Sequence, residues 1–230
     1  MDGDSPGKQH RCSVMHFSSK GRKAAVKEFS NQRVKENDDD KPVRHPFVQA
    51  KSFTKGRIKS VQLIVLHSEE APKTEGRTRN VVHFFQTAPA SAHFCVDDKE
   101  VIQCVKLEDT AFQCKNANAN GIGIEHSGFA AQSAEEWQDD YSKAMFDLST
   151  DLAAQLCKKF NIPAQAATFV GQQNPTVVKP GFVMHKDVPL HGSHTDPGAQ
   201  FPIAAYVAQV QQKVEALNAA ASDLAASPSN

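Results

Sequence analysis

The sequence predicts a single α/β domain with a central mixed β-sheet flanked by helices, and three observations lead to this fold class. Short apolar runs rich in β-branched residues alternate with longer segments whose apolar residues recur at helical spacing. Two of the short runs flank a tight polar turn, as in a β-hairpin. The chain of 230 residues is long enough for one well-packed domain with tails. Strands interleaved with helices are typical of α/β folds.

Two apolar runs predict strands that are buried on both faces of the sheet. Val61–Leu66 is too short for a typical helix and is followed directly by His67. Gly121–Ile124 has the same character and is followed by Glu125. Each run therefore delivers a polar, chemically active side chain to the edge of the sheet.

The predicted hairpin lies between these two strands. Residues Ser91–Val96 and Glu100–Val105 read as its strands, joined by a turn that begins with Asp97. This pairing brings Cys95 and Cys104 onto adjacent strands. The chain has five cysteines and no Cys-x-x-Cys pair, so we expect reduced and mostly buried thiols, with a disulfide between these two as the alternative.

Three helices are expected. Polar residues 69–80 read as a loop before a short helix over Val81–Gln86. The main helix is predicted to start at a capping box formed by Ser133 and Glu136, and a second long helix to run from about Pro202 to Leu224. The apolar stripe of the main helix consists of Trp137, Tyr141, Ala144, Leu148, Leu152, Leu156 and Phe160. Its tryptophan is expected in the core, a sugar-stacking platform being the alternative.

Charge is distributed unevenly along a chain of zero formal net charge. Residues 1–59 contain 14 Lys/Arg and 7 Asp/Glu, whereas the remainder contains 12 and 19. This asymmetry favours contact with an anionic surface, and the alternative is a solvated disordered tail. Because residues 1–45 lack a sustained apolar period, we expect a flexible arm there. We divide the chain into a basic arm over 1–56, a folded domain over 57–218, and a helix end and tail over 219–230.

We identify no transmembrane or secretory signal in the sequence pattern. No window approaches the roughly 18 consecutive apolar residues that a transmembrane helix needs. The polar N-terminus also lacks the apolar core of a secretory signal peptide. We therefore expect synthesis in the cytoplasm.

Side chains that ligate metals are concentrated in the segment His185–Asp196, which holds three His and two Asp between Pro and Gly residues. Zinc accepts imidazole nitrogen and carboxylate oxygen, and a catalytic zinc site keeps one position open for water. His67 is a further candidate ligand, and Glu125 is a candidate base. Spacing alone leaves the choice open within the segment. The competing candidates are His185, His191 and His194 for imidazole, and Asp187 and Asp196 for carboxylate.

The chain resembles the zinc-dependent N-acetylmuramoyl-L-alanine amidases of the peptidoglycan-recognition-protein superfamily over about residues 57–210. The resemblance rests on six motifs that follow one another in the family's order. They are Val65-Leu-His67, Ser91-Ala-His-Phe94, Ile102-Gln-Cys-Val105, Gly121-Ile-Gly-Ile-Glu-His-Ser-Gly128, His185-Lys-Asp-Val188 and Ser193-His-Thr-Asp-Pro-Gly198. Enzymes of this family cleave the amide between the lactyl group of N-acetylmuramic acid and the L-alanine that begins the stem peptide. The resemblance thus makes residues 57–218 a zinc amidase catalytic domain.

The resemblance also implies a role for each site residue. His67, His185 and Asp196 would be the ligands of Zn²⁺, and Glu125 the base that activates the metal-bound water. His194 falls where many relatives place a Lys that steadies the developing oxyanion, and an imidazole N–H can do the same. Because all three ligand positions are filled, catalysis is favoured over the alternative of a non-catalytic peptidoglycan-binding module.

Three further side chains are predicted to contact the substrate, namely His93, Gln113 and Asn118. Where relatives often show Trp-His-Ala-Gly, this chain has Phe112–Lys115, so the amide at Gln113 replaces a group that can titrate. His93 faces either the groove or the core. The segment Asn116–Asn120 offers amides to sugar or peptide, a plain turn being the alternative. By strand alternation His126 points away from the base and is left out of the site.

Two biological roles fit an amidase of this kind: a phage endolysin and a cytosolic enzyme that recycles wall fragments. The basic arm favours the endolysin, because anionic wall polymers or outer-membrane lipid would attract it, whereas soluble muropeptides do not require it. An endolysin is made in the host cytoplasm and reaches the wall after the membrane is permeabilised. The expected partner is peptidoglycan. Nucleic acid is not expected, since the arm has few aromatics and several interspersed acids.

Overall fold

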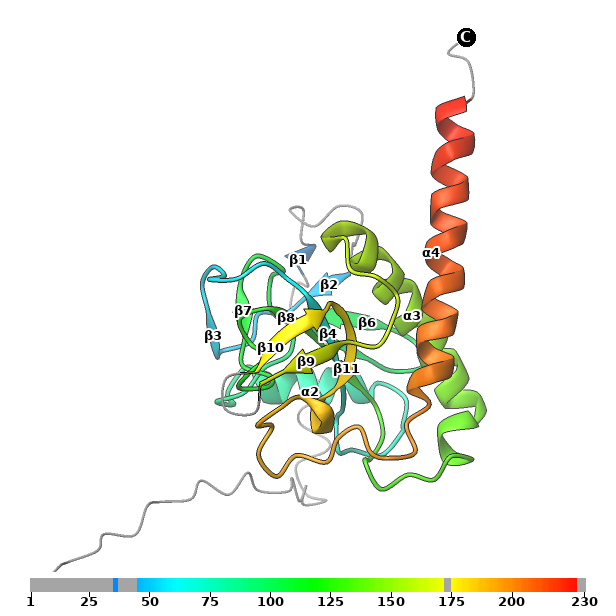
Figure 1. The fold of residues 1–230 in the computed structure, drawn as a ribbon. Helices are drawn as coiled ribbons and strands as arrows, with labels where there is room; N and C mark the ends of the chain where they lie inside the picture. Colours follow the sequence, from blue (N-terminus) through cyan, green and yellow to red (C-terminus); the bar gives the residue numbers. More distant parts are fainter. Residues whose placement is uncertain (1–34, 37–44, 172–174, 227–230) are drawn as a thin grey trace, which may run out of the picture.

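The computed structural model describes residues 35–36, 45–171 and 175–226. A mixed sheet lies at the centre, with helices on both faces, as the sequence predicts (Figure 1). Its strands, in spatial order, are β1 (Lys35–Glu36), β2 (Pro46–Phe47), β6 (Val101–Gln103), β5 (Phe94–Val96), β8 (Gly121–His126), β4 (Leu63–Ser68) and β11 (Gly181–Met184). The flexibility predicted for the arm concerns residues that lie almost entirely outside the described part of the chain.

Parallel pairing at the centre of the sheet fixes where the polar strand ends lie. Strand β4 pairs in parallel with β8 on one side and with β11 on the other, and β5 pairs in parallel with β8. The register places His67 directly opposite Glu125, and Met184 opposite Leu66. The carboxyl ends of three strands therefore meet at one edge of the sheet, where ligands of open α/β sheets usually bind.

The other elements cover the sheet or border it. The helices are α2 (Arg77–Phe85), α3 (Asp140–Phe160) and α4 (Ile203–Ala226), with short 3₁₀ turns η1 (Glu136–Gln138) and η2 (His185–Asp187). Two small antiparallel pairs, β3 (Phe53–Thr54) with β7 (Thr110–Ala111) and β9 (Thr168–Val170) with β10 (Thr176–Lys179), lie beside the main sheet. Among the helices of the described residues, none combines the length and apolarity needed to span a membrane.

The two faces of the sheet pack against different helices because side chains alternate along each strand. Leu66 and Ile124 are fully buried on the face covered by α3 and α4, together with Trp137, whose core position is thus confirmed. On the opposite face, α2 packs against the hairpin strands. Each fully buried Leu or Ile side chain contributes roughly 1.5–3 kcal/mol of transfer free energy, so the central strands anchor the domain.

The predicted hairpin is confirmed, with shorter strands than expected. Cys95 pairs with Ile102 in the antiparallel register. The Sγ atoms of Cys95 and Cys104 lie 4.0 Å apart, and both cysteines are free thiols. The first of the two expectations, buried and reduced cysteines, therefore holds for these residues.

Part of the segment assigned to the arm, within residues 45–56, contacts the sheet. Strand β2 pairs with β6, the Val48 amide donates to the Gln103 carbonyl, and Ala50 is buried. Backbone hydrogen bonds attach this segment to the sheet, and Val48, Ala50 and Phe53 pack against the hydrophobic cluster that includes α2. Sequence periodicity gives no signal for such an attachment.

Two helix starts also differ from prediction. Helix α2 begins at Arg77, inside the segment read as a loop, after Gly76 adopts a left-handed conformation. The capping box is present, since the Ser133 amide donates to Glu136 and the Glu136 amide donates to Ser133 Oγ. It closes the 3₁₀ turn η1, however, and α3 starts later, with Asp139 as its N-cap.

Replacing Asp139 by Ala is expected to lower the free energy of unfolding by about 1 kcal/mol, because α3 loses its side-chain cap. Asp139 Oδ1 accepts a hydrogen bond from the Ser142 amide at 2.8 Å, and its Oδ2 lies 2.6 Å from Lys73 Nζ. Denaturant unfolding measures the change. Asp140→Ala is the matched control, because that side chain is fully exposed at the next position. An equal loss in the control would contradict the assignment of the cap.

Candidate active site

Three segments far apart in the sequence bring metal-ligating side chains to the carboxyl edge of the sheet. His67 is the fifth residue of β4, and His185 follows β11 directly, at the start of η2. Asp196 comes from the loop after η2, where the Lys186 amide donates to the Asp196 carbonyl at 3.0 Å. The three predicted ligands therefore converge because two parallel strands end side by side and the following loop folds back over them.

The geometry of this cluster suits a tetrahedral metal. His67 Nδ1 lies 2.9 Å and His185 Nδ1 lies 3.1 Å from the same oxygen of Asp196, and the three ligand atoms all lie within 4.8 Å of one another. Two imidazole nitrogens and one carboxylate oxygen are the donor set of a catalytic zinc site, which leaves one position for water or substrate. Within the described ranges, His191 and Asp187 do not join the cluster.

Charge in the cluster is already arranged for metal binding. Burial alone would raise the pKa of Asp196, but hydrogen bonds from His185, His194 and His67 lower it well below its ordinary value. Burial lowers the pKa of His185 and would lower that of His67, whose pKa the carboxylates of Glu125 and Asp196 nevertheless raise. Metal ligation requires an ionised carboxylate and neutral imidazoles. Asp196 and His185 already favour these states, whereas the raised pKa of His67 means that metal binding must displace a proton from its ring.

Glu125 lies beside the cluster on the neighbouring strand, opposite His67 in the register. Burial raises the pKa of its carboxyl to about 7, and the nearby His67 opposes part of this rise. A carboxyl group that titrates near neutral pH can both accept and return a proton, as a general base must. Glu125 thus lies beside the candidate metal ligands, and its role as the base stays a prediction.

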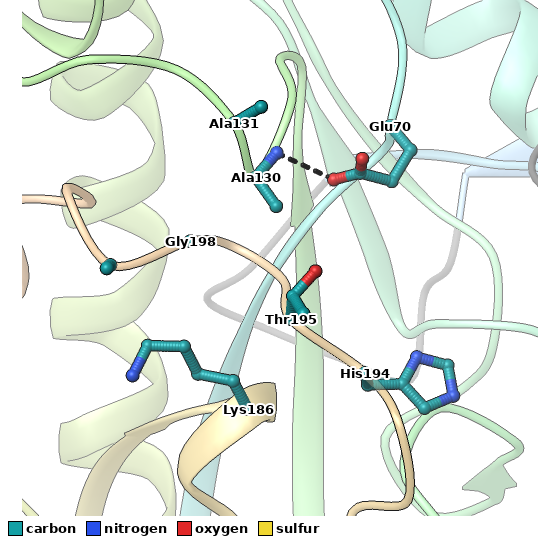
Figure 2. Close-up of a pocket in the computed structure, with 8 residues that line it drawn as sticks. Glu70, Ala130, Ala131, Lys186, His194, Thr195 and Gly198 are labelled. Atoms are coloured by element: carbon teal, nitrogen blue, oxygen red, sulfur yellow. Dashed lines mark hydrogen bonds between the residues drawn. The ribbon is translucent and has the colours of Figure 1, made fainter.

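His194 borders the cluster on its open side. Its ring stacks on that of His185, with centroids 4.1 Å apart, and its Nδ1 lies 3.4 Å from Asp196 Oδ1. The side chain is 42% exposed, unlike the buried ligand His185. A cavity of about 420 Å³ opens beside it, lined also by Glu70 and Lys186 (Figure 2). His194 can thus reach a bound substrate from the solvent side.

The walls of this cavity carry one acidic and one basic side chain that the sequence analysis did not single out. A Glu70 carboxylate oxygen accepts from the Ala130 amide at 2.8 Å, which fixes the acid against the loop before η1 (Figure 2). Lys186 Nζ lies 2.7 Å from Asp187 Oδ1. Lys186 lies within the motif His185-Lys-Asp-Val188 and Glu70 within the segment read as a loop, but nothing in the sequence indicated that either side chain borders a cavity.

Of the two orientations left open for His93, towards the groove or towards the core, the structure shows the buried one. This side chain is completely buried, its Nδ1 accepts a hydrogen bond from the Gly123 amide, and its Nε2 lies 2.6 Å from an Arg57 guanidinium nitrogen. Burial lowers the pKa of His93 well below its ordinary value, and Arg57 lowers it further. His93 is therefore a neutral interior residue. It lies just before β5 rather than within a strand, so strand alternation could not predict the direction of its side chain.

The other two predicted substrate contacts lie in the turn before β8. Gln113 Oε1 lies 3.2 Å from His67 Nε2, on the side of the imidazole opposite the cluster. Asn118 Oδ1 accepts hydrogen bonds from the amides of Gln113 and Cys114, which uses both of its lone pairs. For Asn118 the turn alternative is the one that the structure supports, and Gln113 contacts a metal-ligating residue.

His126 points to the opposite face of the sheet, as predicted. Its Nδ1 bonds to the His67 carbonyl and its Nε2 lies 2.7 Å from Ser149 Oγ. Burial lowers the pKa of His126 to about 4, so this imidazole is neutral. It supports the backbone of β4 from behind the site.

A buried His-His-Asp cluster beside a carboxyl group, at the edge of an α/β sheet, is the arrangement expected of a metal-dependent hydrolase. The sequence profile of the N-acetylmuramoyl-L-alanine amidases (Amidase_2) matches residues 57–199, and the chain belongs to this family. It is an N-acetylmuramoyl-L-alanine amidase with peptidoglycan as the substrate of its family, and the His-His-Asp cluster is its candidate metal site.

Individual relatives agree with this assignment. N-acetylmuramoyl-L-alanine amidase A of Achromobacter lyticus is 29% identical over 142 residues, which cover 57% of this chain and 76% of that protein. The structure of a selenomethionine AmpD derivative superposes with a TM-score of 0.53 at 17% identity, covering 71% of this chain and 92% of that one. The PlyG catalytic domain gives 0.50 at 18% identity, covering 72% and 87%. The two structural matches show a shared fold.

Metal content should separate the ligands from their neighbours. Elemental analysis of the purified protein is expected to give about one zinc per chain, and Asp196→Ala to lose it, because a catalytic site keeps only three protein ligands. His194→Ala is expected to keep its zinc and to lose turnover. Asp187→Ala is the matched control, a carboxylate in the same segment that is expected to change neither. Loss of zinc in His194→Ala would make His194 a ligand and refute its separate role.

Proposed function

We propose that this amidase is a zinc enzyme that cuts intact peptidoglycan between N-acetylmuramic acid and L-alanine, as a bacteriolytic endolysin. The observation that carries the zinc mechanism is the convergence of two Nδ1 atoms on one buried carboxylate beside a base whose pKa is about 7. A pure binding module would need no such base. The cavity lined by His194 and Thr195 offers room for part of the substrate.

The residues divide the hydrolytic work among them. Zinc, when bound by His67, His185 and Asp196, supplies a Lewis acid that lowers the pKa of water and polarises the scissile carbonyl. Glu125 accepts the proton of the attacking water and later donates it to the leaving amine of alanine. His194, on the open side, donates a hydrogen bond to the developing oxyanion.

Glu125→Gln is expected to abolish release of N-terminal L-alanine from purified peptidoglycan at every pH, because the amide cannot accept a proton. In the wild type, kcat/KM should be full at high pH and fall as the pH drops through the pKa of Glu125, at or below about 7, since bound zinc stabilises the carboxylate. Zinc content should stay unchanged in the variant. Substantial turnover by zinc-loaded Glu125→Gln would remove Glu125 from the mechanism.

The endolysin role rests on the uneven charge of the chain. The excess of Lys/Arg over Asp/Glu in residues 1–59 would draw the enzyme to anionic wall polymers or outer-membrane lipid. On this proposal the enzyme is made in the host cytoplasm and acts on the wall once the membrane is permeabilised. A cytosolic muropeptide-recycling amidase is the second candidate, because small soluble substrates fit the same catalytic residues.

Neutralising the arm in the full-length chain tests this role. Residues 1–34 hold seven cations, Lys8, Arg11, Lys20, Arg22, Lys23, Lys27 and Arg33. Replacing all seven by Gln should slow digestion of intact sacculi by about tenfold at low salt, because electrostatic steering is lost. The difference should shrink near 0.15 M salt, where the screening length is about 8 Å. Hydrolysis of a soluble muropeptide is the control and should not change. Undiminished sacculus digestion at low salt would favour the recycling role.

A further inference from the structure

We infer that Gln113 is a positioning residue that holds His67 in the one tautomer able to bind metal through Nδ1. The inference rests on the zinc site proposed above and adds a residue to its support. Gln113 was expected to contact substrate, but its carboxamide is directed at the back of a ligand imidazole. Its contact with His67 therefore affects metal binding rather than binding of the sugar or the peptide.

The two nitrogens of His67 face different partners. Nδ1 lies 2.9 Å from Asp196 Oδ2, inside the ligand cluster, whereas Nε2 lies 3.2 Å from Gln113 Oε1. Ligation through Nδ1 uses the lone pair of that nitrogen, so the proton of the neutral ring must sit on Nε2. Nε2–H then donates to Gln113 Oε1. An acceptor at this point fixes both the tautomer and the orientation of the ring.

The opposite orientation of the Gln113 carboxamide would not stabilise this tautomer of His67. With Nε2 of Gln113 turned towards His67, an N–H group would face another N–H group. In the observed orientation the Gln113 Nε2 atom is buried without a hydrogen-bond partner in the described structure. A buried unsatisfied donor costs about 1–3 kcal/mol. The turn therefore holds the Gln113 carboxamide so that its oxygen contacts His67, although its nitrogen has no hydrogen-bond partner in the described structure.

Strand β8 leaves room for this carboxamide through two glycines. A Cβ atom at Gly123 would lie 1.9 Å from Gln113 Oε1, and one at Gly121 would lie 3.1 Å from Gln113 Nε2. Glycine weakens a strand interior and often marks the close approach of another group. Here both glycines lie on the same face as Glu125, since side chains alternate along the strand. The amide thus lies across β8 to reach His67 on β4.

The backbone under Gln113 is fixed from the other side. Asn118 Oδ1 accepts from the Gln113 amide at 2.9 Å and from the Cys114 amide at 2.7 Å, and the Ala117 amide donates to the Cys114 carbonyl at 2.8 Å. The turn is therefore closed by its own hydrogen bonds. Because the backbone of Gln113 is fixed and its side chain lies against Gly121 and Gly123, few other positions are open to its Oε1 atom.

Zinc affinity tests the inference without reference to catalysis. Gln113→Met keeps the length of the side chain and removes the acceptor, and it should weaken zinc binding by about 10–100-fold in competition with a chromophoric chelator. Gln113→Glu restores an acceptor and should recover most of the loss. Asn116→Leu is the matched control, because that exposed amide in the same turn donates only to carbonyls of the loop at Pro189 and Leu190.

A second variant acts on the same amide from β8. In Gly123→Ala the new Cβ collides with the far end of a flexible side chain, so the protein should fold while the Gln113 carboxamide moves off His67. Its loss of zinc affinity should not add to that of Gln113→Met in the double variant, because both remove one interaction. Gly121→Ala is not an equivalent test. Its Cβ would lie 2.5 Å from the Ala117 backbone carbonyl, which cannot move aside as a flexible side chain can.

The tautomer itself can be observed by NMR of ¹⁵N-labelled imidazoles in the zinc-loaded protein. The wild type should show a protonated His67 Nε2 with slow solvent exchange, and Gln113→Met should exchange it faster. Wild-type zinc affinity and wild-type exchange in Gln113→Met would overturn the inference and leave the amidase unaffected. If the wild type binds zinc and shows these differences but releases no alanine from peptidoglycan, the proposed function fails and the positioning role stands.

Discussion

The rest of the site depends on the burial of one carboxylate between two imidazoles. Removing an ionised carboxylate from water is expensive unless charged or hydrogen-bonded partners replace the solvent. For Asp196 the partners are His67 Nδ1 and His185 Nδ1, at 2.9 and 3.1 Å, with His194 Nδ1 at 3.4 Å from the other oxygen. The loop that carries Asp196 is therefore stabilised in the arrangement that brings three ligand atoms together. A cation bound there would take over the same role more strongly.

That arrangement is possible only because the sheet supplies two of the partners from rigid positions. Strands β4 and β11 are buried and parallel, so their ends deliver His67 and His185 side by side. Behind them, His126 bonds to the His67 carbonyl and to Ser149 Oγ, which lies 2.6 Å from the Tyr206 hydroxyl. These contacts join the back of the site to α3 and α4. The helices thus stabilise the ligand geometry as well as the apolar core.

Sequence reasoning succeeded where a residue's position follows from its own strand. His67 and Glu125 end apolar runs, and strand alternation correctly turned His126 away. It failed where position depends on contacts between distant segments. The sequence left both orientations of His93 open, and it did not show that residues 46–50 attach to the sheet by backbone hydrogen bonds. The predicted capping box is present, but it closes η1, and the long helix starts at Asp140 because Asp139 is extended and caps it.

Strand β8 shows how one short sequence meets two requirements at once. Ile122 and Ile124 fill the core beneath α3, while Gly121 and Gly123 leave the opposite face low enough for the Gln113 carboxamide to pass. Glycine is a poor strand former, so its cost must be offset by the burial of the two isoleucines and by pairing with strands on both sides. The alternation of Gly and Ile therefore has a reason on each face. One face supplies stability, and the other supplies space for the group that orients His67 and a position for Glu125 at its end.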